Sequence, residues 1–331
     1  MQKPQKFFIV TPVLDDWESL DKLIEDISAQ PELAPHDIRI LAVDDGSSAY
    51  ERPNPERLVG PIKEIVVAHL RANQSHQRAI ALGMAYVKEH YSEFSVLVMD
   101  SDGEDRPEEV AQLVERAADK PNSIIVARRR KRSEGTQFRA GYWVYKLLFS
   151  LLTGKDISFG NFSFIPQSKI DNVIYNSNIW NNFAATILRS RVPIEFVETD
   201  RGTRYFGESR MNVTSLMVHG LSAIAVFSDI VISRLIIALT GMFVLFSFGI
   251  LAVIAAKFAV DYYNIPGLFL PGYATNIILA LVNILVSSLF IGLLMILNLL
   301  TTRSQATALP SQLMVELIGK VETITLSEKA N

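Results

Sequence analysis

Two aspartates with the spacing of a metal site, Asp100 and Asp102, directly follow the apolar run 95–99. Two carboxylates in this spacing just beyond a strand can hold a hard divalent cation, and such a cation can bridge the phosphates of a nucleotide. We therefore expect Asp100 and Asp102 to hold Mg²⁺ or Mn²⁺ on a diphosphate. An ordinary acidic turn at the end of a strand is the alternative.

A second acidic string, AVDDGSS at 42–48, also passes from an apolar run into a glycine turn. A carboxylate there, such as Asp45, can accept hydrogen bonds from a base or a ribose hydroxyl. The string NQSHQRA at 73–79 lies where a loop is expected to enter a helix, and helix N-termini bind anions. Asn73 and His76 are therefore further candidates for ligand binding, although both strings also fit solvated surface segments.

Two strings rich in arginine complete the set, RRRKR at 128–132 and RGTRYFGESR at 201–210. Arginine binds phosphate groups with two parallel hydrogen bonds, so both strings suit an anionic substrate. In the first string we expect one or two side chains to be functional and the others to be solvated. A localisation signal or an RNA-binding patch is a further option for that string.

Segments typical of strands and of helices alternate in the chain before the arginine strings. This alternation predicts an α/β domain with a mostly parallel sheet covered by helices on both faces. Ligands of such sheets bind at the carboxyl ends of the strands, where the acidic strings lie. The expected strands are 6–13, 38–43, 64–70, 95–99 and 123–127, and the expected helices are 14–27, 77–90 and 107–118.

Two long segments near the C-terminus, 235–256 and 262–302, contain no charged side chain. A bilayer core about 30 Å thick needs roughly 20 apolar helical residues. We expect two transmembrane helices, at about 233–257 and 274–300, joined by a short loop that contains proline and glycine. Two buried helices of a large soluble core are the alternative.

Four parts are expected around these helices. They are a catalytic domain at 1–210, an interfacial amphipathic segment at 211–230, the two membrane helices within 231–302, and a tail at 303–331. The apolar run near the N-terminus is too short for a secretory signal, so we expect the catalytic domain and the tail in the cytoplasm. For the interfacial segment, a helix packed on the sheet is the alternative.

The composition excludes several classes of function. The net charge is −3 and the isoelectric point is near 6.0, so no global positive field favours nucleic acid and no nucleic-acid partner is expected. The chain has no cysteine, which excludes disulfides, zinc sites made of thiolates and a cysteine nucleophile.

Together these strings resemble the family-2 glycosyltransferases, which are inverting enzymes with the GT-A fold, and within them the polyisoprenyl-phosphate branch. The resemblance covers residues 7–300. PVLDD at 12–16 is similar to the family's P-x-x-N-E, and VDDGS at 43–47 is identical to its V-D-D-G-S. NQSHQRA at 73–79 is similar to its N-x-G-x-x-x-A, with serine in place of glycine. MDSD at 99–102 is similar to its M-D-x-D, and RYFGESR at 204–210 is similar to its R-x-x-G-x-S-K/R.

The resemblance implies a role for each matching residue. It implies nucleotide-sugar binding by Pro12, Asp16, Asp45, Asn73, His76 and Asp100, metal binding by Asp100 and Asp102, and binding of the acceptor phosphate by Arg204, Ser209 and Arg210. From the first arginine string we add Arg128 as a further ligand of the acceptor phosphate, and the expected catalytic residues are Asp100, Asp102, Arg128 and Asn161. We expect Arg204 to serve the acceptor and to leave donor affinity almost unchanged.

One departure from the family concerns the string GNFS at 160–163, where relatives often carry G-D-F-R. Asn161 cannot take a proton, so it cannot act as the base that a carboxylate there would provide. A lipid phosphate is already ionised at neutral pH and needs no base, whereas a hydroxyl acceptor needs one. The asparagine therefore favours a phosphate acceptor, although a subgroup with another acceptor stays open.

The predicted reaction is the transfer of a single sugar, with inversion, from a nucleotide-diphosphate sugar to undecaprenyl or dolichyl phosphate. It is expected at the cytoplasmic face of the inner (plasma) membrane, in a multi-pass protein whose partners are the donor, the polyprenyl phosphate and the lipid bilayer; a homo-oligomer stays open. The alternatives are a membrane-bound glycosyltransferase that acts on a hydroxyl of a glycolipid or a cell-envelope polysaccharide, and a catalytically silent membrane scaffold.

Overall fold

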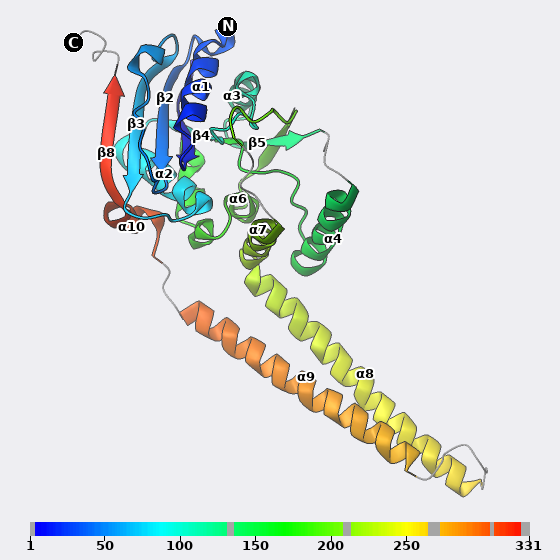
Figure 1. Cartoon of the computed structure of the whole chain (residues 1–331). Coiled ribbons are helices and arrows are strands. Elements are labelled where there is room, and N and C mark those ends of the chain that lie inside the picture. Colours follow the sequence, from blue (N-terminus) through cyan, green and yellow to red (C-terminus); the bar gives the residue numbers. More distant parts are fainter. Residues whose placement is uncertain (1–3, 131–135, 208–212, 264–271, 305–307, 326–331) are drawn as a thin grey trace. The chain divides into compact units, whose positions relative to one another are not determined.

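The computed structural model describes residues 4–130, 136–207, 213–263, 272–304 and 308–325. The chain divides into two compact units (Figure 1). The first unit comprises residues 1–226 and 307–331, and the second comprises residues 227–306.

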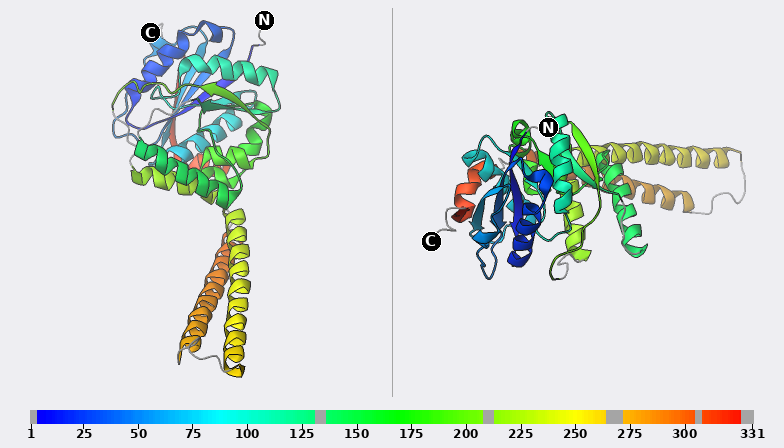
Figure 2. Two further views of the ribbon diagram at one scale, coloured as in Figure 1. Left: turned by 90° about the vertical axis from the view of Figure 1, so that its right-hand side faces the viewer. Right: turned by 90° about the horizontal axis from the view of Figure 1, so that it is seen from above.

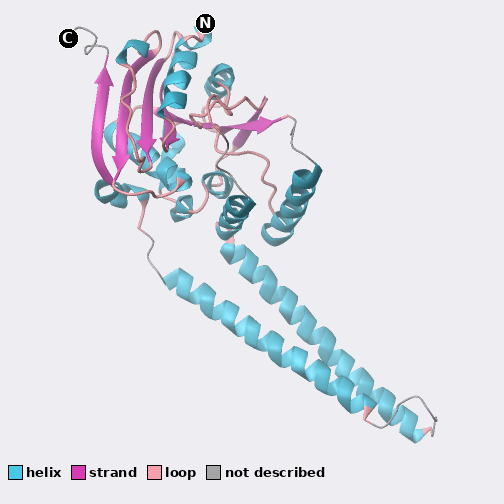
Figure 3. Ribbon diagram, viewed as in Figure 1, coloured by secondary structure: helices cyan, strands magenta, loops and turns pink. Residues whose placement is uncertain are grey.

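The first unit is built on an eight-stranded sheet, whose strands are magenta in Figure 3. The strand order is β7-β5-β6-β4-β1-β2-β3-β8. Strands β4, β1, β2 and β3 are parallel, and so are β5 and β7. Strand β6 runs antiparallel between β4 and β5, and β8 runs antiparallel to β3. This mostly parallel sheet confirms the predicted α/β class. The strands are β1 Lys6–Val13, β2 Asp37–Asp44, β3 Ile62–Leu70, β4 Ser95–Val98, β5 Ile124–Arg129, β6 Ser163–Ile165, β7 Ile194–Thr199 and β8 Ile318–Thr325.

Helices cover both faces of this sheet (Figure 2). Strand β1 is apolar throughout because both of its sides are buried: Phe8 and Val10 pack with the core on one face, while Phe7 and Ile9 pack with the core on the other. The first core includes α2 His76–His90, α5 Ile170–Ile174 and α6 Phe183–Arg189, and the second includes α1 Trp17–Ser28 and α3 Val110–Asp119.

Helix α1 illustrates how the sequence positions the site. Its side chains Leu20, Leu23, Ile24 and Ile27 recur at helical spacing and are fully buried against the sheet. Burial of each such side chain contributes about 1.5–3 kcal/mol. The start of α1, directly after β1, is therefore held at the carboxyl edge of the sheet.

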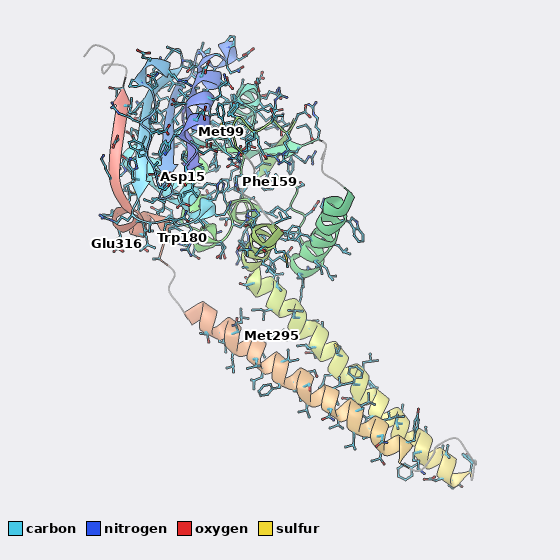
Figure 4. All side chains as sticks on the ribbon, in the orientation of Figure 1. Asp15, Met99, Phe159, Trp180, Met295 and Glu316 are labelled. Atoms are coloured by element: carbon cyan, nitrogen blue, oxygen red, sulfur yellow. The ribbon has the colours of Figure 1, made fainter. Side chains whose placement is uncertain are left out.

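The C-terminal part of the chain differs from the expected tail at 303–331. Helix α10 (Pro310–Leu317) packs on α2, and the indole Nε1–H of Trp180 donates to the carbonyl oxygen of Ala308 at 2.7 Å (Figure 4). Strand β8 then pairs with β3 along its length, and Ile324 is fully buried. The expectation of a separate tail is corrected for residues 310–325, because this segment completes the sheet of the first unit.

The second unit consists of α8 (Ser228–Tyr262) and α9 (Tyr273–Ser304), which pack against each other. Both helices are long and apolar enough to cross a membrane. Their apolar side chains are exposed along the length of the pair, including Ile237 at 71% and Phe248 at 65%. The helices are longer at both ends than the two expected spans.

Two amphipathic helices of the first unit, α4 (Thr136–Thr153) and α7 (Val213–Ala225), also pack on each other. Both expose large apolar side chains, among them Trp143 on α4 and Met217 on α7. Helix α7 lies in the segment 211–230, for which the sequence predicts interfacial character.

Candidate active site

A cavity of about 280 Å³ opens at the carboxyl ends of β1, β2 and β4, beside the start of α2. This is the edge at which parallel sheets bind ligands. Eight residues that the sequence predicts for the site line this one cavity: Pro12, Asp16, Asp45, Asn73, His76, Asp100, Asp102 and Arg204.

Asp44 is the last residue of β2 and Asp45 begins the turn that follows, and their side chains make different contacts. Asp44 Oδ1 accepts a hydrogen bond from the backbone N–H of Ser47 at 2.9 Å and so closes the turn. Asp45 Oδ1 accepts from the backbone N–H of Gln74 at 2.6 Å. Burial raises the pKa of Asp45, and the N–H of Gln74 opposes that shift. Asp45 thus joins the two loops and lines the cavity.

The close approach of these loops explains two residue choices. Gly46 has φ +81°, and an added Cβ would lie 3.0 Å from the backbone nitrogen of Asn73. Ser75 has a backbone φ of 76°, which residues with a side chain rarely adopt and which glycine adopts easily. The family motif carries glycine at the position of Ser75, so the chain keeps the backbone conformation and accepts some strain.

The loop after β4 presents Asp100 and Asp102. Oδ1 of Asp100 lies 3.2 Å from Nε2 of His76, and the backbone N–H of Asp100 donates to Asp105 at 3.1 Å. Burial alone would raise the pKa of Asp100, but the nearby charges of His76, Arg129 and Arg204 together outweigh it and the pKa is lowered. For Asp102, burial and the neighbouring Asp100 raise the pKa. Asp100 is therefore the stronger anionic ligand of the two.

His76 shows the reciprocal effect. Desolvation would lower its pKa, but the carboxylate of Asp100 outweighs this and the pKa of His76 is raised. Its Nε2 also lies 3.0 Å from Nδ2 of Asn161, whose Oδ1 accepts from Nε2 of Gln77 at 3.3 Å. Asn161 therefore contacts the cavity through His76.

The two aspartates of the loop fit part of a metal site. Oδ1 of Asp100 is buried, and its nearest charged or polar partner is Nε2 of His76 at 3.2 Å, so a hard cation could still bind this oxygen. Among the described residues, no group of three or more His, Cys, Asp or Glu side chains is arranged to hold a metal ion. Asp100 and Asp102 would therefore hold Mg²⁺ or Mn²⁺ only together with oxygens of a bound diphosphate and water.

Arg204 lies between two of the carboxylates. Its Nη2 is 2.6 Å from Oδ2 of Asp16, and its Nη1 is 3.0 Å from Oδ2 of Asp102. The segment 201–206 folds back on the acidic loop: the backbone N–H of Tyr205 donates to the carbonyl oxygen of Asp102, and a Cβ on Gly202 would lie 2.0 Å from the carbonyl oxygen of Gly103. The sequence predicts that Arg204 serves the acceptor and lies apart from the donor pocket, and the structure places it in the same cavity as Asp45.

The arginines at the end of β5 face opposite sides. Arg128, which the sequence predicts to bind phosphate, pairs with Glu198 on β7 and lies 4.7 Å from the centroid of the Phe196 ring. Arg129 instead lies 3.4 Å from Asp105 and 3.7 Å from Glu104 on the acidic loop. The structure therefore brings Arg129, and not Arg128, to the carboxylates. Ser209 and Arg210 lie outside the described residues.

Two residues near the site, Asp105 and His219, were not predicted from the sequence motifs. Asp105 is buried beside Asp100, and burial followed by the charge of Asp100 raises the pKa of Asp105 to about 7. His219 of α7 lies with Nε2 3.4 Å from Nδ2 of Asn182, and burial followed by the charge of His76 lowers its pKa. The spacing DSDGED at 100–105 is the one local hint of Asp105.

The fold and the acidic cavity are those of a glycosyltransferase. The chain belongs to the family described as glycosyl transferase family 2, whose model matches residues 8–192.

Two curated relatives illustrate where the chain lies within this family. An undecaprenyl-phosphate 4-deoxy-4-formamido-L-arabinose transferase of Enterobacter sp. (strain 638) is 27% identical over 245 residues, which cover 68% of this chain and 72% of the relative. A protein of the same name from Sodalis glossinidius is 26% identical over 304 residues, which cover 88% of this chain and 87% of the relative.

Among solved structures, glucosyl-3-phosphoglycerate synthase from Mycobacterium tuberculosis, crystallised with Mn²⁺ and UDP-glucose, matches with a TM-score of 0.48 and 13% identity. The match covers 69% of this chain and 79% of that one. Mannosyl-3-phosphoglycerate synthase from Rubrobacter xylanophilus matches with a TM-score of 0.46 and 14% identity, covering 81% and 78%.

Proposed function

We propose that this glycosyltransferase moves one sugar from a nucleotide-diphosphate sugar to a polyprenyl phosphate at the surface of a membrane, with inversion at the anomeric carbon. The observation that carries the proposal is that Asp16, Asp45, Asp100, Asp102 and Arg204 line one cavity of a chain that also has two membrane-type helices. The relatives named above act, by their names, on undecaprenyl phosphate, which supports an acceptor of this class.

On the donor side, Asp45 and Asp16 would hold the nucleoside, because carboxylates at strand ends accept hydrogen bonds from base and ribose donors. Asp100 and Asp102 would hold Mg²⁺ or Mn²⁺, which when bound offsets the negative charge that develops on the departing diphosphate. Both aspartates belong to the same loop, so donor binding and leaving-group stabilisation are coupled by one short segment.

On the acceptor side, an ionised phosphate oxygen would form the bond to the anomeric carbon while the bond to the nucleoside diphosphate breaks on the opposite face. The nucleoside diphosphate leaves with the bonding electron pair, and no proton has to be removed from the acceptor. The reaction therefore needs no general base at position 161, where the chain has Asn161. Arg204, which lines the cavity, offers a guanidinium group to phosphate oxygens. We propose that Ser209 and Arg210 assist in binding the same phosphate.

The membrane part of the proposal rests on exposed apolar surface. Helices α8 and α9 would span the inner membrane, with the catalytic unit in the cytoplasm. In the catalytic unit, the paired helices α4 and α7 expose Trp143 at 65%, Leu151 at 69% and Met217 at 64%. Such surfaces are typical of helices that lie in the interface of a bilayer.

The experiment that tests the function uses membranes that contain the unaltered chain or its Asp102→Asn variant. A panel of radiolabelled nucleotide sugars is supplied together with undecaprenyl phosphate, and label in the organic phase is measured. We expect one donor to label the lipid with the unaltered chain and not with the variant. Equal labelling by both would contradict the assignment of the reaction to this cavity.

A further inference from the structure

Strand β8 follows the two long apolar helices in the sequence, yet it brings the carboxylate of Glu322 to His69, which contacts the end of β2 beside Asp45. In the antiparallel pairing with β3, Glu322 stands opposite Val67, so its side chain lies on the same face of the sheet as His69. Its Oε1 is 3.8 Å from Nε2 of His69, and Lys320 also contacts this oxygen from the exposed side. At 3.8 Å this is not a hydrogen bond, and the carboxylate attracts the ring electrostatically when His69 is protonated.

His69 also contacts Asp44, which directly precedes Asp45. Its Nδ1 lies 2.8 Å from Oδ2 of Asp44, and the ring nitrogen donates because an ionised carboxylate only accepts. The other oxygen of Asp44 closes the turn at Ser47. Ser47 Oγ in turn accepts from the backbone N–H of Asp15 at 2.9 Å, next to Asp16.

A second connection runs through an aromatic cluster. The hydroxyl of Tyr50 donates to Oε2 of Glu322 at 3.0 Å, and its ring packs edge-on against His69 at 4.7 Å and against Trp17 at 5.0 Å. The indole of Trp17 donates to the carbonyl oxygen of Ala49 at 2.9 Å. Both sides of the turn 44–50 are thus tied to one carboxylate, although Glu322 does not line the cavity.

We propose that Glu322 is a positioning residue of the donor site, which acts through His69 and Tyr50 to hold the turn 44–48 so that Asp45 and Asp16 meet the nucleotide. The segment that follows the apolar helices is then a functional part of the nucleotide site. This inference rests on the donor half of the proposed function alone, because nucleotide binding does not require the acceptor.

The test is calorimetric titration of the purified full chain with uridine, guanosine, cytidine and adenosine diphosphates in Mg²⁺, followed by titration of each variant with the nucleotide that binds most tightly. Glu322→Gln keeps an acceptor for Tyr50 and removes the charge beside His69. We expect its nucleotide affinity to fall about threefold to tenfold. Lys320→Gln, which removes the exposed partner of Glu322, should change the affinity by less than about twofold.

A purely structural role of β8 is separated by two further variants. Ile324→Val trims a fully buried side chain of the same strand and should lower the melting temperature without lowering nucleotide affinity. The double variant Glu322→Gln/His69→Gln should lose no more affinity than His69→Gln alone, because both residues act along one connection. The proposal is overturned if Glu322→Gln binds the nucleotide normally, if Ile324→Val weakens binding equally, or if the two losses add. Absence of transfer to polyprenyl phosphate would instead refute the acceptor assignment and leave these affinities in place.

Discussion

Removal of the Arg204 side chain should have a large effect on the donor. The guanidinium group contacts Asp16 at 2.6 Å and Asp102 at 3.0 Å, and the three side chains are only 16–23% exposed. At this exposure the small values of surface ion pairs do not apply. Arg204 compensates the charge of two carboxylates that would otherwise face an anionic diphosphate. Each charge-assisted contact is worth about 1.5–3 kcal/mol, and we expect the loss of this compensation to weaken binding of donor and transition state by roughly 3 kcal/mol, the lower bound for two such contacts.

Since 1.4 kcal/mol is a factor of ten, Arg204→Ala should lower kcat/KM for the donor about a hundredfold. The diphosphate would then meet Asp16 and Asp102 without the cation that compensates them, so the KM for the donor should rise. Arg204→Lys should recover part of the loss, because one ammonium group can meet only one of the two carboxylates at a time.

The assay varies nucleotide sugar and polyprenyl phosphate separately. Arg201→Ala is the matched control, because Arg201 pairs with Glu104 at 2.7 Å on the same loop but does not line the cavity. We expect this control to stay within about threefold of the unaltered chain. A normal donor KM in Arg204→Ala, with the whole loss in the KM for the acceptor, would refute the placement of Arg204 in the donor site.

Three further predictions concern the acidic loop and its support. Asp102→Asn should lower kcat about a hundredfold or more with an unchanged melting temperature, because the leaving group loses charge compensation; near-normal turnover at saturating Mg²⁺ and donor would contradict this. Asp105 has its pKa raised by burial from 3.8 to about 7, so its contribution to stability is present below the lower value and is lost as pH rises through about 7. The melting temperature should therefore fall less steeply between about pH 4 and pH 8 in Asp105→Asn than in the unaltered chain. Equal slopes of melting temperature against pH would contradict the raised pKa of Asp105. Gly202→Ala places a Cβ 2.0 Å from the carbonyl oxygen of Gly103 and should destabilise the fold by at least about 2 kcal/mol in denaturant unfolding, whereas a neutral effect would mean that the two segments do not pack as described.

The sequence was sufficient to predict the parallel sheet and most of the residues that line the acidic cavity, because those signals are local. Apolar runs that end in carboxylates identify strand ends, and parallel strands bring those ends to one edge. Asp45 and Asp100 could therefore be assigned to one site without knowledge of any long-range contact. The helical spacing in α1 likewise predicts which side faces the sheet.

The contacts that the sequence could not predict join distant segments. Arg204 meets Asp16, 188 residues earlier in the chain, because a loop without secondary structure folds back on the acidic turn. The assignment of Arg128 depended on where β5 ends: the expected strand stops at residue 127, but β5 continues to Arg129 and its alternation turns Arg128 toward Glu198. Strand β8 places Lys320, Glu322 and Ile324 on one face of the sheet. A pattern this short, with two charged residues and one apolar residue, does not predict that the strand pairs with β3.

The most direct test of sugar transfer to a lipid phosphate compares two acceptors in one assay. The purified full chain is reconstituted in lipid vesicles with its labelled nucleotide sugar and Mg²⁺, and either undecaprenyl phosphate or undecaprenol is supplied. We expect labelled lipid with the phosphate only, because Asn161 provides no base for a hydroxyl and Arg204 offers a guanidinium group to phosphate oxygens. Equal labelling of undecaprenol would contradict the proposed acceptor.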